Sequence, residues 1–172
     1  CLLAKSRSGL SEKIVGLLKR FIQKCLPAAL NFHFNFLVAK LRLLAVLKRI
    51  GKGTFIDKTV NVFGWKNVSI GCNSVIGEDS WLNVNDRIAG LDQIQIGDNC
   101  YIGRRNLFSS GRQLIIGHYV MTSNECKFLG NNHVFQNPMQ PYVSTGTTSG
   151  GIMKIGVNTW IGAGAIVLGN VT

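Results

Sequence analysis

The stretch IGCNSVIGEDSW (residues 70–81) is followed, after a short insertion, by IGDNCYIGRRNL (residues 96–107), and the two match position by position. Each contains two units of six residues that begin with Ile-Gly. Further Ile-Gly pairs begin at residues 50, 116, 155 and 161. Repetition at a short fixed period is typical of a solenoid, in which each repeat packs against the next one.

The first residue of most six-residue units is aliphatic, and the fifth is small or of modest size. The fifth residues are Thr54, Val60, Ser74, Ser80, Cys100, Val120, Cys126, Thr159, Ala165 and Val171. A triangular prism of short parallel strands needs aliphatic side chains in its walls, small residues where walls meet, and glycine or polar residues at the outward turns. A half-buried β-meander would instead alternate with a period of two. We therefore expect a prism whose coils contain three units each.

The coils are expected to start at residues 50, 70, 96, 116 and 155, at separations of 20, 26, 20 and 39 residues. The last separation is the longest because residues 130–154 (GNNHVFQNPMQPYVSTGTTSGGIMK) interrupt the repeat. Pro, Gly, Asn, Ser and Thr are frequent in this segment, as they are in turns and loops. We expect an extruded loop, and functional residues concentrate on such loops.

Over residues 50–172, the repeat and the stretch NNHVFQNPMQPYVSTG…IGVNTWIGAGAIVLGNVT resemble the hexapeptide-repeat acyltransferase superfamily, and within it the sugar O-acetyltransferases of capsule, exopolysaccharide and lipopolysaccharide synthesis. The resemblance implies an all-β fold, a left-handed parallel β-helix of about five coils. It also implies acetyl-CoA as cosubstrate, a sugar hydroxyl as acceptor, and a homotrimer in which the loop of one subunit closes over a site shared with its neighbour. Relatives commonly continue beyond VLGNVT, so we expect that a C-terminal coil is missing.

Acyl transfer from a thioester to a hydroxyl requires a base with a pKa near neutrality, and histidine is the natural choice. Among the three histidines, His33 lies in the N-terminal segment and His118 occupies an outward turn position, where a surface role is expected. The resemblance assigns the base to His133, at the start of the loop. The candidates for the group that orients it are Asn131, Asn132, Glu125 and a backbone carbonyl.

The resemblance also places acyl-CoA in a groove along the coils. The matching residues here are Trp160, Gly162, Ala163 and Gly164, although the two glycines are also explained as corner residues. Asn131 and Asn132 are candidates for acceptor binding. Asn106 is a third candidate because it is larger and more polar than its inward fifth position prefers. Arg104 and Arg105 could contact a CoA phosphate or be solvated surface charges.

The net charge of +11 is concentrated at the N-terminus, since residues 1–50 hold ten basic residues and one acid. Residues 1–49 read as a basic amphipathic helical segment, with one helix over 11–26 that ends at Pro27 and a second extending to about Arg49. Three placements stay open: packing on the β-helix or trimer, peripheral membrane contact through residues 11–49, and a membrane span. Nucleic acid is not expected as a partner, because no reading module accompanies the charge.

The five cysteines form no CxxC pair and no short Cys/His spacing, which predicts neither a metal site nor a disulfide framework. A reducing compartment fits this pattern, so we expect a cytoplasmic protein, with possible attachment to the inner face of the membrane. The chain starts without methionine or a secretory signal, and we treat residue 1 as a fragment boundary. A γ-type carbonic anhydrase would need three suitably spaced histidines. His33, His118 and His133 do not have this spacing, so that class of enzyme is not expected. The main alternative function is a non-catalytic β-helix scaffold.

Overall fold

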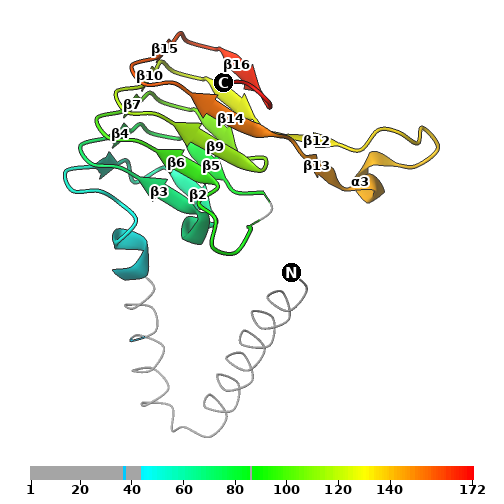
Figure 1. Ribbon diagram of the computed structural model, residues 1–172, viewed down its shortest axis with the longest axis horizontal. Coiled ribbons are helices and arrows are strands. Elements are labelled where there is room, and N and C mark those ends of the chain that lie inside the picture. The colour runs from blue at the N-terminus through cyan, green and yellow to red at the C-terminus, as the bar shows by residue number, and fades with distance from the viewer. Residues whose placement is uncertain (1–36, 38–43, 86) are drawn as a thin grey trace, which may run out of the picture. The chain divides into compact units, whose positions relative to one another are not determined.

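The structure is a computed structural model that describes residues 37, 44–85 and 87–172 (Figure 1). Residues 46–172 form one compact unit. Most of the predicted basic segment 1–49 lies outside the described residues, and within it residues 44–47 are helical. Among the helices that the structure describes, none has the length and apolar character needed to span a bilayer.

Three parallel sheets form the walls of a prism (Figure 1). Wall 1 contains β1 (Phe55–Ile56), β4 (Val75–Ile76), β7 (Tyr101–Ile102), β10 (Met121–Thr122) and β15 (Trp160–Ile161). Wall 2 contains β2 (Asn61–Phe63), β5 (Trp81–Asn83), β8 (Leu107–Ser109), β11 (Lys127–Leu129) and β16 (Ile166–Leu168). Wall 3 contains β3 (Val68–Ile70), β6 (Ile94–Ile96), β9 (Gln113–Ile116) and β14 (Ile152–Ile155). A short 3-10 helix, η1 (Trp65–Asn67), precedes β3.

The strand register confirms the predicted start of every coil. The residue pairs that join successive coils are Ile50↔Ile70, Ile70↔Ile96, Ile96↔Ile116 and Ile116↔Ile155. Each strand in a wall pairs in parallel with the equivalent strand of the next coil. The chain is therefore a left-handed parallel β-helix of five coils, as the six-residue period and the family resemblance predict.

The first and fifth positions of the repeat point into the prism in the middle coils, as predicted. Ile76 and Ile102 are fully buried, and so is Ser80 in a fifth position. The rings of Phe108 and Phe128 stack in the core with their centroids 4.8 Å apart. Equivalent residues of the first and last coils are less buried, because those coils have a described neighbour on one side only.

The corners explain why glycine follows isoleucine in the repeat. A Cβ atom on Gly71 would lie 2.6 Å from the carbonyl carbon of Gly97, and one on Gly97 would lie 2.7 Å from that of Gly117. Where another coil follows, the glycine in the second position therefore has no room for a side chain. The fourth residue of the unit adopts a left-handed conformation, with φ of 53° at Asn73 and 56° at Asn99, and asparagine tolerates this better than most residues.

The extruded segment predicted over residues 130–154 contains regular structure. Its two arms are β12 (Asn131–His133) and β13 (Thr147–Ser149), which pair in antiparallel fashion, and a short helix, α3 (Tyr142–Thr145), lies between them. This hairpin projects away from the prism (Figure 1). Wall 3 resumes at Ile152, because β14 includes the residues that precede the Ile-Gly pair.

We expect iodoacetamide to alkylate Cys72 in the folded protein while Cys100 and Cys126 stay unmodified until the chain unfolds. Cys72 is exposed and the other two are buried, and burial raises the pKa of the Cys100 thiol, which disfavours the reactive thiolate. Peptide mapping by mass spectrometry, after labelling in buffer and in urea, reads each cysteine separately. Equal labelling of the three in buffer would contradict the inward orientation of the fifth position.

Candidate functional site

His133, the predicted base, is the last residue of β12 and pairs with Thr147 across the hairpin. Its side chain is exposed. Within residues 44–85 and 87–172, no hydrogen bond or ion pair engages its imidazole, so this part of the chain supplies no partner that orients the ring. The hairpin therefore exposes the imidazole of His133 to solvent.

Asn132 stabilises the backbone at this position. Its Oδ1 accepts a hydrogen bond of 2.9 Å from the backbone N–H of His133, and its carbonyl accepts one of 3.2 Å from the Thr148 hydroxyl. Glu125, another candidate orienting group, lies at the corner between walls 1 and 2 and forms an ion pair with Arg105 at 2.8 Å. The hairpin leaves from a different corner, between walls 2 and 3.

Asn131 begins β12, two residues before His133. Because side chains alternate along a strand, Asn131 and His133 share one face of β12 and Asn132 lies on the other. The Oδ1 atom of Asn131 is buried and has no hydrogen-bond partner within the described residues. Buried polar atoms are almost always hydrogen-bonded, which makes this oxygen exceptional.

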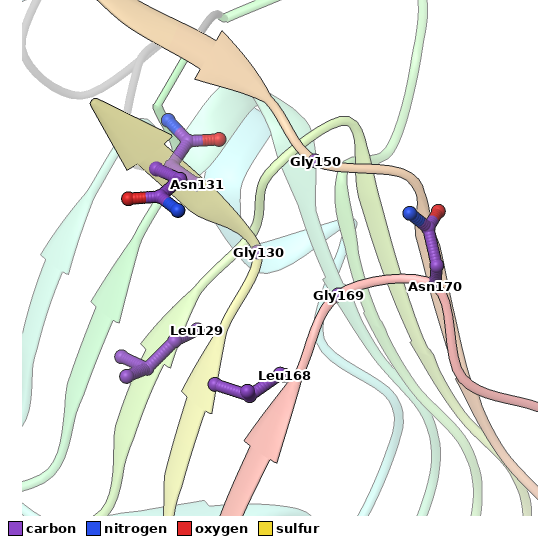
Figure 2. Close-up of a pocket in the computed structure, with 8 residues that line it drawn as sticks. Leu129, Gly130, Asn131, Gly150, Leu168, Gly169 and Asn170 are labelled. Carbon is purple, nitrogen blue, oxygen red and sulfur yellow. The ribbon is translucent and has the colours of Figure 1, made fainter. Parts of the chain in front are cut away.

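A pocket of about 330 Å³ lies where the hairpin leaves the prism (Figure 2). Its lining residues come from the ends of β11 and β16, the start of β12 and the chain before β14. They are Leu129, Gly130, Asn131, Asn132, Gly150, Leu168, Gly169 and Asn170. The fold therefore brings two of the predicted acceptor-binding residues, Asn131 and Asn132, into one cavity next to the strand that carries His133.

Two features of the fold shape this pocket. Leu129 and Leu168 are paired neighbours on wall 2. Phe128, the middle residue of β11, faces the core. Because side chains alternate along a strand, Leu129 and its neighbour Leu168 point outward. On the hairpin side, a Cβ atom on Gly150 would lie 1.9 Å from the carbonyl oxygen of Gly130. Gly150 thus lets the arms of the hairpin approach each other as they leave the corner, whereas Gly130 lets the chain pack against Gly111 of the preceding coil.

The residues predicted to bind acyl-CoA lie elsewhere on the prism. Trp160 is on wall 1 with its side chain 72% exposed, and its indole N–H lies 3.4 Å from the Ser123 hydroxyl. Gly162, Ala163 and Gly164 form the exposed corner between walls 1 and 2, where a Cβ atom on either glycine would meet nothing within 4 Å. A single chain does not bring this corner into the pocket beside the hairpin.

Asn106, the third predicted acceptor contact, is 1% exposed. Its amide group donates to the carbonyls of Gly103 and Ser123, at 2.9 and 3.0 Å, and its Oδ1 accepts the backbone N–H of Cys126 at 2.7 Å. The side chain thus joins two successive coils from within the core. These bonds give a structural reason for its polarity, and we leave it out of the proposed site.

The remaining charged candidates have partners at the surface. Arg104 forms an ion pair with Glu78 at 2.8 Å, and the hydrogen bond to Glu78 raises the pKa of Arg104. His118 is exposed, as predicted for an outward turn, and its Nδ1 accepts the backbone N–H of Asp98 at 2.9 Å. No group of three His, Cys, Asp or Glu side chains able to hold a metal ion occurs among the described residues.

Leu129, Leu168 and Asn170 were not among the sequence candidates. A signal for the two leucines exists once the register is known. The outward column at the end of wall 2 runs from Phe63 through Asn83 and Ser109 to Leu129 and Leu168. It is polar in the second and third coils and apolar again from the coil at which the hairpin leaves.

No family model and no curated protein matches the chain. Among solved structures, the chain is similar to two variants of AntD, an N-acyltransferase from Bacillus cereus, both in complex with dTDP and coenzyme A. One comparison has a TM-score of 0.54 at 20% identity over 71% of this chain and 64% of the AntD chain. The other has a TM-score of 0.49 at 19% identity over 69% and 72%. This chain spans 64% of the length of the first variant, and the likeness concerns the fold.

We expect Asn106→Leu to lower the free energy of unfolding by about 1–3 kcal/mol, because it leaves the buried Cys126 N–H without an acceptor. Urea denaturation measures this change. The control is Asn61→Leu, since Asn61 is exposed on wall 2, where substitutions typically change stability by less than about 0.5 kcal/mol. Unchanged stability together with lost acceptor binding would return Asn106 to the site.

Proposed function

We propose that this chain transfers an acyl group, acetyl in the first instance, from acyl-CoA to a sugar hydroxyl in surface polysaccharide or lipopolysaccharide synthesis. The observation that carries the proposal is the exposed His133 on a hairpin extruded from a β-helix, two residues from an asparagine that lines a pocket. Similarity in fold to AntD, which was solved with coenzyme A, supports a CoA thioester as the donor.

In the proposed reaction, the imidazole of His133 takes the proton from the acceptor hydroxyl as its oxygen attacks the thioester carbonyl. The tetrahedral intermediate then collapses, the carbon–sulfur bond breaks, and the departing CoA sulfur receives the proton from the imidazolium. The acceptor gains an ester and free CoA leaves. Holding both substrates in position supplies much of the remaining rate enhancement.

The donor is proposed to lie along Trp160, Gly162, Ala163 and Gly164, in keeping with the family resemblance. Because this corner and the hairpin belong to different edges of the prism, we propose that a complete site combines the donor corner of one copy with the hairpin of another.

Two uncharged apolar surfaces support a homotrimer. On wall 1, the outward residues Phe55, Val75, Tyr101, Met121 and Trp160 are aligned by the strand register. On the hairpin, Val143 is 94% and Met139 is 89% exposed, and residues 134–150 contain no charged side chain. Large exposed apolar surfaces usually mark interfaces, and a repeated contact between two different surfaces closes into a ring of three when each copy is rotated by a third of a turn relative to the last.

An amine acceptor is the second candidate, and it is favoured by one observation: AntD is an N-acyltransferase. The chemistry of the product distinguishes the two. Alkaline hydroxylamine cleaves the oxygen ester that a hydroxyl acceptor gives and leaves an amide intact. The scaffold alternative predicts neither product and no binding of acyl-CoA.

We expect His133→Ala to reduce the rate of acceptor-dependent thiol release from acetyl-CoA by about 10²–10⁴-fold, the usual contribution of a general base. The rate is followed with a thiol reagent over a panel of sugars. His118→Ala is the matched control, since His118 is also exposed but bonds to the Asp98 backbone, and its rate should be unchanged. Equal rates for His133→Ala and the parent protein would remove His133 from the mechanism.

We expect Val143→Asp to shift the protein from trimer towards monomer and to reduce acyl transfer in parallel, because a buried unpaired charge is unfavourable at an apolar contact. Sedimentation velocity measures the shift. Asn61→Asp adds the same charge at an exposed position of wall 2 and should stay trimeric. A parent protein that sediments as an active monomer would overturn the shared site.

A further inference from the structure

We infer that the pocket at the foot of the hairpin binds an uncharged sugar ring, whose apolar face lies on Leu129 and Leu168 and one of whose polar hydrogens bonds to Asn131. This inference rests on the proposed function and specifies the part of the acceptor that the site recognises. It follows from the apolar floor of the pocket, its unpaired oxygen, its lack of charge and its position relative to His133 (Figure 2).

The floor of the pocket is apolar. Leu168 is 60% exposed, and it is aligned through Leu129 with Ser109, Asn83 and Phe63 of the earlier coils. The prism accepts polar residues at this outward position, as Asn83 and Ser109 show, so leucine is not required there by the fold. A ligand that presents C–H groups to the two leucines would remove their side chains from water.

Asn131 lines the pocket, and its Oδ1 atom is buried without a partner within the described part of the chain. Because solvent does not reach this oxygen, the side-chain amide has to turn towards the cavity in the proposed complex, where a ligand hydroxyl or amide N–H would satisfy it. A site built to bond such a group discriminates strongly against analogues without it. The apolar floor and the polar acceptor together match a sugar ring that has one C–H face and hydroxyls at its edge.

No charged side chain lines the pocket, since its members are leucine, glycine and asparagine. A phosphate or carboxylate placed there would lose water without gaining a counter-charge, which is strongly unfavourable. The pocket therefore selects the uncharged part of an acceptor. Any charged group of the same molecule has to lie outside it.

The position of the pocket fits the proposed chemistry. Asn131 and His133 share a face of β12 and are separated by two residues, or roughly 6.6 Å along the strand at the usual rise. A sugar ring that bonds to Asn131 can direct a second hydroxyl along the strand towards the imidazole. The pocket would thus hold the ring while His133 acts on a substituent at its edge.

The test uses two matched substitutions on β16 and a third in the turn that follows it. Leu168→Asn changes the floor, whereas Ile166→Asn makes the same change two residues earlier, on the same side of β16, at a residue that is 59% exposed and does not line the pocket. Gly169→Val fills the cavity instead. A Cβ atom on Gly169 makes only ordinary contacts of 3.7–3.8 Å, and circular dichroism checks that the variant with the larger side chain is folded.

Binding is measured by saturation-transfer difference NMR with methyl glycosides of a hexose, a 6-deoxyhexose, a hexuronic acid and a hexose 6-phosphate. We expect the two uncharged glycosides to bind and the two charged ones not to bind. Leu168→Asn should weaken binding about tenfold, within the range for lost apolar contacts, and Gly169→Val should abolish it. Ile166→Asn should bind like the parent protein.

Equal effects of Leu168→Asn and Ile166→Asn would overturn the inference, as would preferential binding of the charged glycosides or no binding of an uncharged one. Thiol release from acetyl-CoA is measured on the same samples. Binding with the expected pattern but without thiol release would contradict the proposed acyl transfer and leave the sugar pocket standing. Thiol release that is insensitive to Leu168→Asn and Gly169→Val would contradict the sugar pocket and leave the proposed acyl transfer standing.

Discussion

The close stacking of equivalent residues in successive coils is the constraint on which this structure depends. At most corners that follow walls 1 and 3, the glycine after isoleucine leaves room for the backbone of the next coil, as at Gly71 against Gly97. Because all three walls keep one register, additional residues can leave the prism only between two walls. The insertions 84–93 and 130–151 both leave between walls 2 and 3, so the fold itself gathers the non-repetitive part of the chain at one corner.

The same constraint explains how much the sequence could predict. A repeat of six residues with three units per coil fixes which side chains point inward, and every coil start predicted from Ile-Gly is confirmed by the pairing. The hairpin within residues 130–154 could be predicted only as a departure from the repeat. Its arms pair across a gap without periodicity, and no local pattern sets the register of Asn131 against Ser149.

Asn106 and Leu168 show why single positions were harder to interpret than the fold. A polar residue in an inward position suggests function, yet Asn106 bonds to partners in the next coil and is fully accounted for by them. An apolar residue such as Leu168 attracts no attention in a hydrophobic sequence, yet it pairs with Leu129 and the two form the floor of a pocket. Both judgements require the neighbour one coil away, which is 20 to 39 residues distant in the chain.

The arrangement of the candidate residues also bears on why the active unit should contain more than one copy. A prism separates its corners by whole walls, so a base carried at one corner cannot act on a thioester held at another corner of the same coil. On the proposed function, a hairpin that extends beyond the wall would solve this problem, because it would place the proposed base where an adjacent copy can present its own corner. The exposed, uncharged surfaces of the hairpin and wall 1 would then be covered by contacts between copies instead of promoting aggregation. They would bring the two halves of the proposed chemistry together.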